Sequence, residues 1–221
     1  LHGGIIPVCG TFFVFSDYMK PAFRMSALMR QQVIYVWTHD AFRVGEDGPT
    51  HQPVEHELQV RLMEALKNHK GKNSMLVLRP ADVDETTVAW KMALENQDTP
   101  TALILSRQNV KNLPRKESKY NEALGATKGA YIVKDCEGTA DVILLASGSE
   151  VSTLVAATEL LESRANLNVR IVSVPSEGLF FSQPESYIRS VIDYNLPIFG
   201  LTAGLPLSMQ RLVGLKGKVF G

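Results

Sequence analysis

The residues with the clearest chemical potential lie in a nine-residue segment, GEDGPTHQP, at residues 45–53. Its glycines and prolines are incompatible with a regular helix, so its titratable side chains must be held in an irregular loop. The segment follows a strand-like apolar run, and open α/β sheets hold their ligands just beyond the carboxyl ends of strands. Asp47 and His51 stand out, because a neutral imidazole can exchange a proton near pH 7 and a carboxylate can orient it or bind a hydroxyl.

Two further polar residues, His39 and Arg107, each come directly after an apolar strand-like run. A fixed arginine at a strand end suits a phosphate or a carboxylate, because its guanidinium forms paired charge-assisted hydrogen bonds. Each residue also has an ordinary structural interpretation: His39 as a surface histidine bonded to a loop carbonyl, and Arg107 as one partner of a linker salt bridge. Their position with Asp47 and His51 beyond the strands of one predicted domain favours a shared site.

Three aromatic residues near the start, Phe12, Phe15 and Tyr18, are spaced three apart. This spacing predicts a single stripe along a helix over residues 12–30. Packing in a hydrophobic core would account for such a stripe, and so would a wall against which a flat heterocycle stacks.

The elements that must position these residues alternate along the chain. Short apolar runs predict strands at residues 33–38, 74–78, 101–106, 131–134, 142–146, 169–174 and 197–201. Amphipathic stretches predict helices at residues 12–30, 51–68, 82–96, 149–164 and 184–194. Asp82 with Glu85 three residues later forms an acidic capping box, and Ser149 is a candidate N-cap. Alternating strands and helices imply parallel strands with right-handed crossovers.

A polar, irregular stretch divides the chain, which predicts two domains joined by a linker. We assign residues 1–115 to the first domain, residues 116–128 to the linker and residues 129–221 to the second domain. The predicted fold class is α/β, with two three-layer α/β/α domains built on mostly parallel sheets. Both ends look like the interior of a longer protein, so we expect truncation at each end.

The bulk composition excludes several classes of function. Lysine plus arginine and aspartate plus glutamate both number 23, so no basic face for nucleic acid is implied. No apolar run is long enough to cross a membrane. Cys9 and Cys136 form no CxxC motif, which favours a reducing cytoplasmic setting without a disulfide. His39, His51 and His56 lack a compact ligand spacing, so we predict no metal site in this chain.

Six motifs in order resemble the transketolase family, and they extend over nearly the whole chain. They are GTFFVFSDY at residues 10–18, THD at 38–40, GEDGPTHQP at 45–53, LRPAD at 78–82, SRQN at 106–109 and ASGSEV at 146–151. The resemblance implies a thiamine diphosphate-binding fold: a pyrimidine-binding domain followed by a transketolase C-terminal domain. It also implies transfer of a two-carbon glycolaldehyde unit from a ketose phosphate to an aldose phosphate in the pentose phosphate pathway.

The resemblance assigns a role to seven residues. The cofactor-binding residues would be Phe12, Phe15 and Tyr18, with Phe15 stacked on the aminopyrimidine ring of thiamine diphosphate. The substrate-binding residues would be His39 and Arg107 at the sugar phosphate and Asp47 at a sugar hydroxyl. The catalytic residue would be His51, which would assist the donor's first hydroxyls.

The resemblance further implies a homodimer, with the cofactor between the pyrimidine-binding domain of one subunit and the diphosphate-binding domain of the other. The activating glutamate, the diphosphate-binding domain and its divalent metal, Mg or Ca, would lie before residue 1. We therefore expect the 221 residues alone to be inactive and to bind the cofactor weakly. The stretch at residues 57–73 also departs from the family, being longer and more charged.

Other functions stay open from the sequence. Arg107 with His39 favours phosphorylated sugars over 2-oxoacids, and Gln52-Pro53 favours transketolase over deoxyxylulose phosphate synthase. Dihydroxyacetone synthase is harder to separate, and formaldehyde as the acceptor would distinguish it. A non-catalytic subunit and a general anion-binding α/β module are alternatives from other classes.

Overall fold

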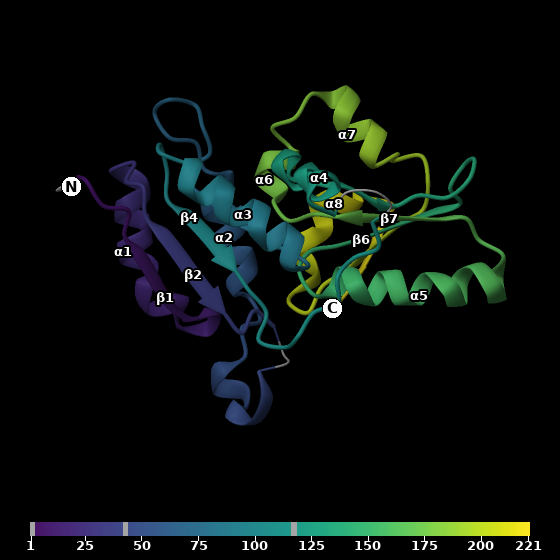
Figure 1. The fold of residues 1–221 in the computed structure, drawn as a ribbon, viewed down its shortest axis with the longest axis horizontal. Helices are drawn as coiled ribbons and strands as arrows, with labels where there is room; N and C mark the ends of the chain where they lie inside the picture. The colour runs from purple at the N-terminus through teal and green to yellow at the C-terminus, as the bar shows by residue number, and fades with distance from the viewer. Residues whose placement is uncertain (1–2, 42–43, 116–118) are drawn as a thin grey trace.

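The structure, a computed structural model, describes residues 3–41, 44–115 and 119–221. It contains two sheets side by side: one from the first half of the chain, purple to teal in Figure 1, and one from the second half, green to yellow. Helices pack on both faces of each sheet. The predicted α/β class with mostly parallel sheets is confirmed.

The first sheet has the strand order β1-β2-β4-β3, and every neighbouring pair is parallel. Its strands are β1 (Val8–Phe12), β2 (Ile34–Thr38), β3 (Leu76–Leu78) and β4 (Thr101–Ile104). Phe12 pairs with Thr38, and Trp37 pairs with Ile104. The residues that follow β1, β2 and β4 therefore emerge along one edge of the sheet.

Alternation along the strands divides the core of the first sheet between two faces. The covering helices are α1 (Ser16–Leu28), α2 (His56–Ala65) and α3 (Val83–Glu95). Tyr35 and Trp37 of β2 pack with Phe23 of α1 and Val60 of α2. Ile34 of the same strand packs with α3 on the opposite face. The sheet thus has the three-layer build that a parallel sheet requires.

The second sheet has the order β5-β7-β6-β8-β9, in which only the β5–β7 pair is antiparallel among the described strands. Its strands are β5 (Tyr131–Lys134), β6 (Val142–Ala146), β7 (Val169–Ser173), β8 (Ile198–Leu201) and β9 (Lys218–Phe220). One face is covered by α5 (Glu150–Ala165). The other is covered by α6 (Glu177–Phe180), α7 (Glu185–Val191) and α8 (Gln210–Val213).

Two predicted helices start later than expected. The chain from residue 8 to Phe12 is strand β1, and a short 3-10 turn, Phe13–Phe15 (η1), separates it from α1. The prediction of one helical stripe through Phe12, Phe15 and Tyr18 is therefore wrong. An edge strand with a partly exposed pattern and a central glycine gives little apolar alternation by which to detect it. The helix expected from residue 51 begins at His56, beyond the 3-10 turn Pro49–His51.

The stretch predicted as an irregular linker is partly helical. Residues 116–118 lie outside the described part, but α4 (Lys119–Ala123) and a 3-10 segment, Leu124–Lys128 (η4), follow directly. Ala123 and Ala126 are buried against Val88 of α3. Two small apolar residues among polar neighbours are enough to hold these turns, and composition alone hides them.

Local signals hold at the predicted start of α3. The Glu85 amide donates to Asp82 Oδ1 at 2.9 Å, and the Ala81 amide donates to Glu85 Oε2 at 2.8 Å. The expected capping box at Asp82 is thus confirmed, with the glutamate reaching one residue further back. Ser149 occupies the N-cap of α5 but makes no capping bond; its hydroxyl donates to Glu150 Oε1 at 2.8 Å.

Cys9 and Cys136 are free thiols. Within the described residues, no helix has the length and apolar character to cross a membrane.

Candidate functional site

The candidate site lies at the carboxyl edge of the first sheet, where β1, β2 and β4 end together. The Leu105 amide donates to the Trp37 carbonyl at 2.7 Å, which extends the ladder to the point where His39 and Arg107 leave the sheet. His39 has a positive φ of 60°, a left-handed conformation that is uncommon for a residue with a side chain. Its Nδ1 lies 3.0 Å from the Thr38 hydroxyl. The backbone at His39 therefore turns sharply out of the strand.

Aromatic rings form one wall of the site. The Phe12 ring stacks on the His39 imidazole, with centroids 3.7 Å apart and planes 22° apart. The Phe15 ring stacks with Phe12 at a centroid separation of 6.2 Å. It packs edge-to-face with the His51 ring, with centroids 5.2 Å apart and planes 80° apart. Tyr18 lies 6.1 Å from Phe15, and its side chain is 83% exposed. The three aromatic residues thus form a continuous wall even though they belong to a strand, a turn and a helix.

The GEDGPTHQP loop folds into two 3-10 turns, Gly45–Asp47 (η2) and Pro49–His51 (η3). The His51 amide donates to the Gly48 carbonyl at 3.1 Å, and His51 Nδ1 lies 2.9 Å from the Thr50 hydroxyl. This contact leaves Nε2 of His51 as the ring nitrogen available to a ligand. The expectation that this segment forms no regular helix is confirmed.

Arg107 lies directly against the loop at Gly45. Gly45 has a φ of +84°, and a Cβ built there would lie 3.0 Å from Arg107 Cζ. The guanidinium therefore packs on a position where a Cβ would displace it, while Arg107 as a whole stays exposed. An exposed guanidinium braced by backbone is suited to a dianion that arrives from solvent.

The charged residues of the site also act on the imidazole of His39. Burial lowers the pKa of His39 below its ordinary value of 6.5, and the nearby Arg107 charge lowers that pKa further. The carboxylates of Asp47 and Asp40 act in the opposite direction without reversing the shift in pKa. His39 is therefore neutral at pH 7 and offers a hydrogen bond rather than a charge.

The structure thus brings together all seven residues singled out from the sequence, with Tyr18 at the outer margin. The arrangement offers stacking surfaces, a carboxylate, two imidazoles and a guanidinium around one opening. Such a set can bind a flat heterocycle beside a hydroxylated anion.

Sequence reasoning missed Asp40, the residue after His39, and Arg79, which binds it. Arg79 Nη2 is 2.8 Å from Asp40 Oδ2, and both side chains are 1% exposed. The signal was available, because Arg79 follows the buried strand β3 in the same way that Arg107 follows β4.

One group of three potential metal ligands occurs among the described residues: Asp17, Glu55 and His56. His56 Nε2 lies 3.3 Å from Asp17 Oδ2, and Lys20 Nζ lies 2.7 Å from Asp17 Oδ1. A lysine ammonium on the same carboxylate opposes a second cation. We interpret the group as a polar contact between Asp17 of α1 and His56 of α2, beside the Lys20–Asp17 ion pair within α1.

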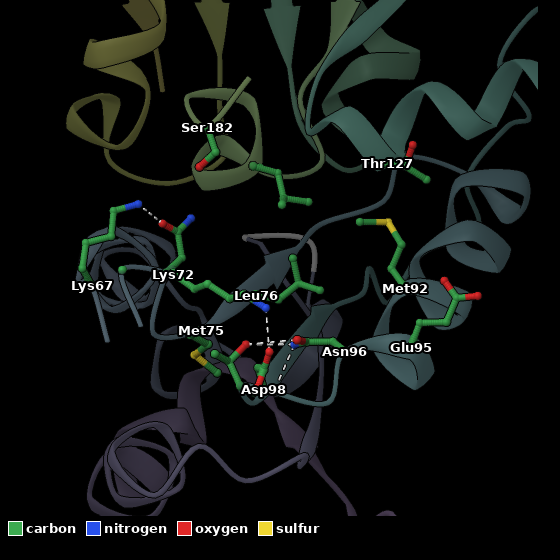
Figure 2. A pocket seen from close by; sticks show the side chains of 14 residues that line it. Lys67, Lys72, Met75, Leu76, Met92, Glu95, Asn96, Asp98, Thr127 and Ser182 are labelled. Atoms are coloured by element: carbon green, nitrogen blue, oxygen red, sulfur yellow. Dashed lines mark hydrogen bonds and ion pairs between the residues drawn. The ribbon is translucent and has the colours of Figure 1, made fainter. Parts of the chain in front are cut away.

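A cavity of about 590 Å³ lies between the two sheets, on the amino-terminal side of β3 and β4 and thus away from the site (Figure 2). Apolar side chains such as Leu76, Met92 and Leu179 line it together with polar residues of both halves. The polar groups bind one another: Lys72 Nζ lies 2.6 Å from Asp98 Oδ2, and Lys67 bonds to Asn73. Both lysines are thus paired with other residues that line the cavity, and neither is directed at a ligand.

Comparison with known proteins agrees with this arrangement. A family model described as "Transketolase, pyrimidine binding domain" matches residues 1–112, and one described as "Transketolase-like TK C-terminal domain" matches residues 129–221. The chain belongs to the transketolase family. A transketolase of Halalkalibacterium halodurans is 46% identical over 221 residues, which cover 99% of this chain and 31% of the relative.

Solved transketolases have the same fold. The transketolase from Leishmania mexicana has a TM-score of 0.79 and 42% identity, over 92% of this chain and 28% of that one. A transketolase from Pichia stipitis, solved as a complex with sedoheptulose-7-phosphate, has a TM-score of 0.74 and 39% identity, over 88% of this chain and 26% of that one. The chain spans about a third of the length of the curated relatives it matches.

Proposed function

We propose that this chain supplies the pyrimidine-binding and C-terminal parts of a cytoplasmic transketolase. The enzyme would move a two-carbon glycolaldehyde unit from a ketose phosphate to an aldose phosphate in the pentose phosphate pathway. One observation carries the proposal: aromatic, acidic, imidazole and guanidinium groups meet at the edge of the first sheet in a member of this family.

The aromatic wall fits the pyrimidine half of thiamine diphosphate. Phe15 is half-buried and Tyr18 is exposed, so a flat ring can stack there without displacing the core. When bound, the cofactor supplies the carbanion chemistry that carbon–carbon cleavage requires. Phe12 holds the His39 ring in place from the same wall.

The polar residues fit a phosphorylated sugar. Arg107 would bind the phosphate through paired charge-assisted hydrogen bonds, with neutral His39 as a second donor. Asp47 would accept a hydrogen bond from a sugar hydroxyl. His51 would accept or return a proton at the donor's first hydroxyls through Nε2, because Thr50 occupies Nδ1.

We further propose that residues 1–115 and 129–221 act as two domains with residues 116–128 between them. The diphosphate and its divalent ion, Mg or Ca, would be held by another domain of a longer protein. In a homodimer, that domain would belong to the sister subunit. The 221 residues alone would then lack activity and bind the cofactor weakly.

The test uses the complete enzyme with xylulose-5-phosphate, the ligand in a solved Pichia stipitis transketolase, as the donor. We expect transfer to an aldose phosphate, loss of turnover in His51→Ala, and a raised KM for phosphorylated acceptors in Arg107→Ala. An Arg107→Ala variant with equal losses on phosphorylated and unphosphorylated acceptors would contradict the phosphate assignment. Calorimetry that gives micromolar thiamine diphosphate binding by the 221 residues alone would contradict the shared cavity. Preferred turnover with formaldehyde as the acceptor would identify dihydroxyacetone synthase instead.

A further inference from the structure

The second sheet and the helices that cover it, residues 129–221, are called the second sheet unit here. This unit binds both the backbone and the side chain of Arg79. Its amide donates to the Pro175 carbonyl at 2.8 Å, and its carbonyl accepts from the Gly148 amide at 3.1 Å. Its Nη1 donates to the Ser147 carbonyl at 3.0 Å and lies 2.6 Å from Glu150 Oε2. The loops after β6 and β7 therefore fix this arginine from one side.

The other side of the guanidinium is bound to the site loop. Arg79 Nε donates to Asp40 Oδ2 at 3.0 Å, and Asp40 is the residue after His39. Asp40 Oδ1 is buried and has no hydrogen-bond partner among the described residues. The Asp40 charge therefore depends on Arg79, because an uncompensated buried carboxylate is costly.

The loop between these groups needs an anchor. His39 adopts its left-handed conformation between Thr38, the last residue of β2, and the anchored Asp40. A strained conformation persists only where the surroundings hold it on both sides. The ladder holds one side and the Arg79–Asp40 pair holds the other.

We propose that Arg79 is a positioning residue that transmits the docking of the second sheet unit to His39. None of the seven site residues comes from the second sheet unit. Arg79 joins that unit to Asp40, next to His39, while a separate contact from Gln108 to Ser149 lies next to Arg107. The readouts in activity rest on the proposed function, but the placement of His39 can be measured without it.

Gly148 shows how closely the second unit approaches. Its φ is +60°, and a Cβ built there would lie 2.8 Å from Arg79 Cζ. The turn after β6 thus leaves room for the guanidinium only because this position lacks a side chain. Glu150 completes the turn, and burial raises its pKa while the charge of Arg79 opposes that rise in pKa.

Arg115 offers a matched control, because it also joins the two halves of the chain. Its side chain is 2% exposed, and it bonds to Asp82 and Asp84 at the start of α3 and to the Tyr131 hydroxyl of β5. These partners do not include Asp40 or any of the seven site residues. Arg115→Lys therefore weakens the same interface without releasing the site loop.

The experiment compares Arg79→Lys with Arg115→Lys in the complete enzyme. Lysine keeps the charge but cannot hold Asp40, Ser147 and Glu150 together, because it lacks the planar fork. The first readout is the His39 pKa by NMR of histidine-labelled protein, with His39→Gln used for assignment. Arg107, Asp47, Asp40 and His51 are the charged and titratable groups that face this imidazole.

We expect Arg79→Lys to move the His39 pKa toward its ordinary value and to raise the KM for a phosphorylated acceptor about tenfold, with a smaller change in kcat. Arg115→Lys should leave both at the level of the unmodified enzyme. Glu150→Gln keeps the Arg79–Asp40 pair and should shift the His39 pKa in the same direction by a smaller amount. If Arg79→Lys fails to fold, the His39 pKa in Glu150→Gln becomes the test of the positioning role.

An unchanged His39 pKa in folded Arg79→Lys, or an equal change in Arg115→Lys, would overturn the proposal. An unchanged pKa in Glu150→Gln would do so where Arg79→Lys does not fold. A shifted His39 pKa in an enzyme without transferase activity would uphold the positioning role and refute the proposed function instead.

Discussion

Replacing Gly45 with alanine tests the contact between the GEDGPTHQP loop and Arg107. The new Cβ would lie 3.0 Å from Arg107 Cζ, closer than ordinary carbon contacts, so the guanidinium must move away. A left-handed φ also costs an alanine about 1–2 kcal/mol relative to glycine. We therefore expect both lower stability and a displaced Arg107 in Gly45→Ala.

The expected effect of Gly45→Ala on substrate binding follows from the hydrogen bond proposed between Arg107 and the substrate phosphate. A hydrogen bond to a charged group is worth about 1.5–3 kcal/mol. Displacement that loses about half of this costs about 0.75–1.5 kcal/mol, which is about a four- to thirteenfold rise in KM for a phosphorylated acceptor. An acceptor without phosphate should show little change, because it makes no use of the guanidinium.

The assay is a double-mutant cycle in the complete enzyme, with Gly45→Ala, Arg107→Ala and the double variant. Two changes that act through one group are not additive, so Gly45→Ala should have little further effect once Arg107 is gone. Thermal unfolding of each variant separates the loss of stability from the loss of binding. Full additivity in the KM for the phosphorylated acceptor would refute the reasoning, because the two residues would then act independently.

Three further predictions concern titration and stacking. His39 should titrate below pH 6.5, because burial and then Arg107 lower its pKa, and NMR should show the pKa rise in Arg107→Ala. As the pH falls, the unfolded state therefore binds this proton at a higher pH than the folded state does. The contribution of His39 to the free energy of unfolding is complete above about pH 6.5 and decreases below that pH. Burial raises the pKa of Glu177 to about 7 against the opposing Arg61 charge, so its contribution is complete below pH 4.5 and is lost as the pH rises through about 7. Urea unfolding at pH 5 and pH 8 should therefore show a dependence of at most about 3 kcal/mol that Glu177→Gln removes, and a Glu177→Gln protein that keeps the full dependence would contradict this assignment. Phe15→Ala should weaken thiamine diphosphate binding by about 0.5–1.5 kcal/mol beyond the lost contact area, and unchanged calorimetry would exclude the stack.

The fold was predictable where apolar periodicity is strong. The strand β6 and the long helix α5 lie within one residue of their predicted limits. Strand β6 is buried at every position and gives an unbroken apolar run, and α5 is long enough for its amphipathic period to be recognised. Strand β1 gave no such signal, because it lies at the sheet edge and pairs on one side only. Segments α4 and η4 were hidden because they bury only a few small residues.

The site was predictable in membership but not in geometry. His39 and Arg107 could be placed because the carboxyl ends of parallel strands share an edge. The stack of Phe12 on His39 could not, since it depends on Phe12 ending a strand and on the left-handed turn at His39. The position of Arg79 after a buried strand could be read from the sequence, but its partners could not: Asp40 and Glu150 lie 39 residues before it and 71 residues after it, by subtraction of their residue numbers.

The charges around Arg79 are better explained by geometry than by stability. The Arg79 guanidinium lies among the carboxylates of Asp40, Glu57 and Glu150. The side chains of Arg79 and Asp40 are 1% exposed, and those of the two glutamates are 11% exposed. Well-packed apolar residues of similar volume often stabilise an interface as much as a buried ion pair does, since desolvation offsets much of the attraction. Apolar surfaces can slide, whereas a planar fork with partners on two separate loops admits one relative placement. A site whose imidazole lies on an irregular turn requires that kind of fixed placement more than it requires additional stability.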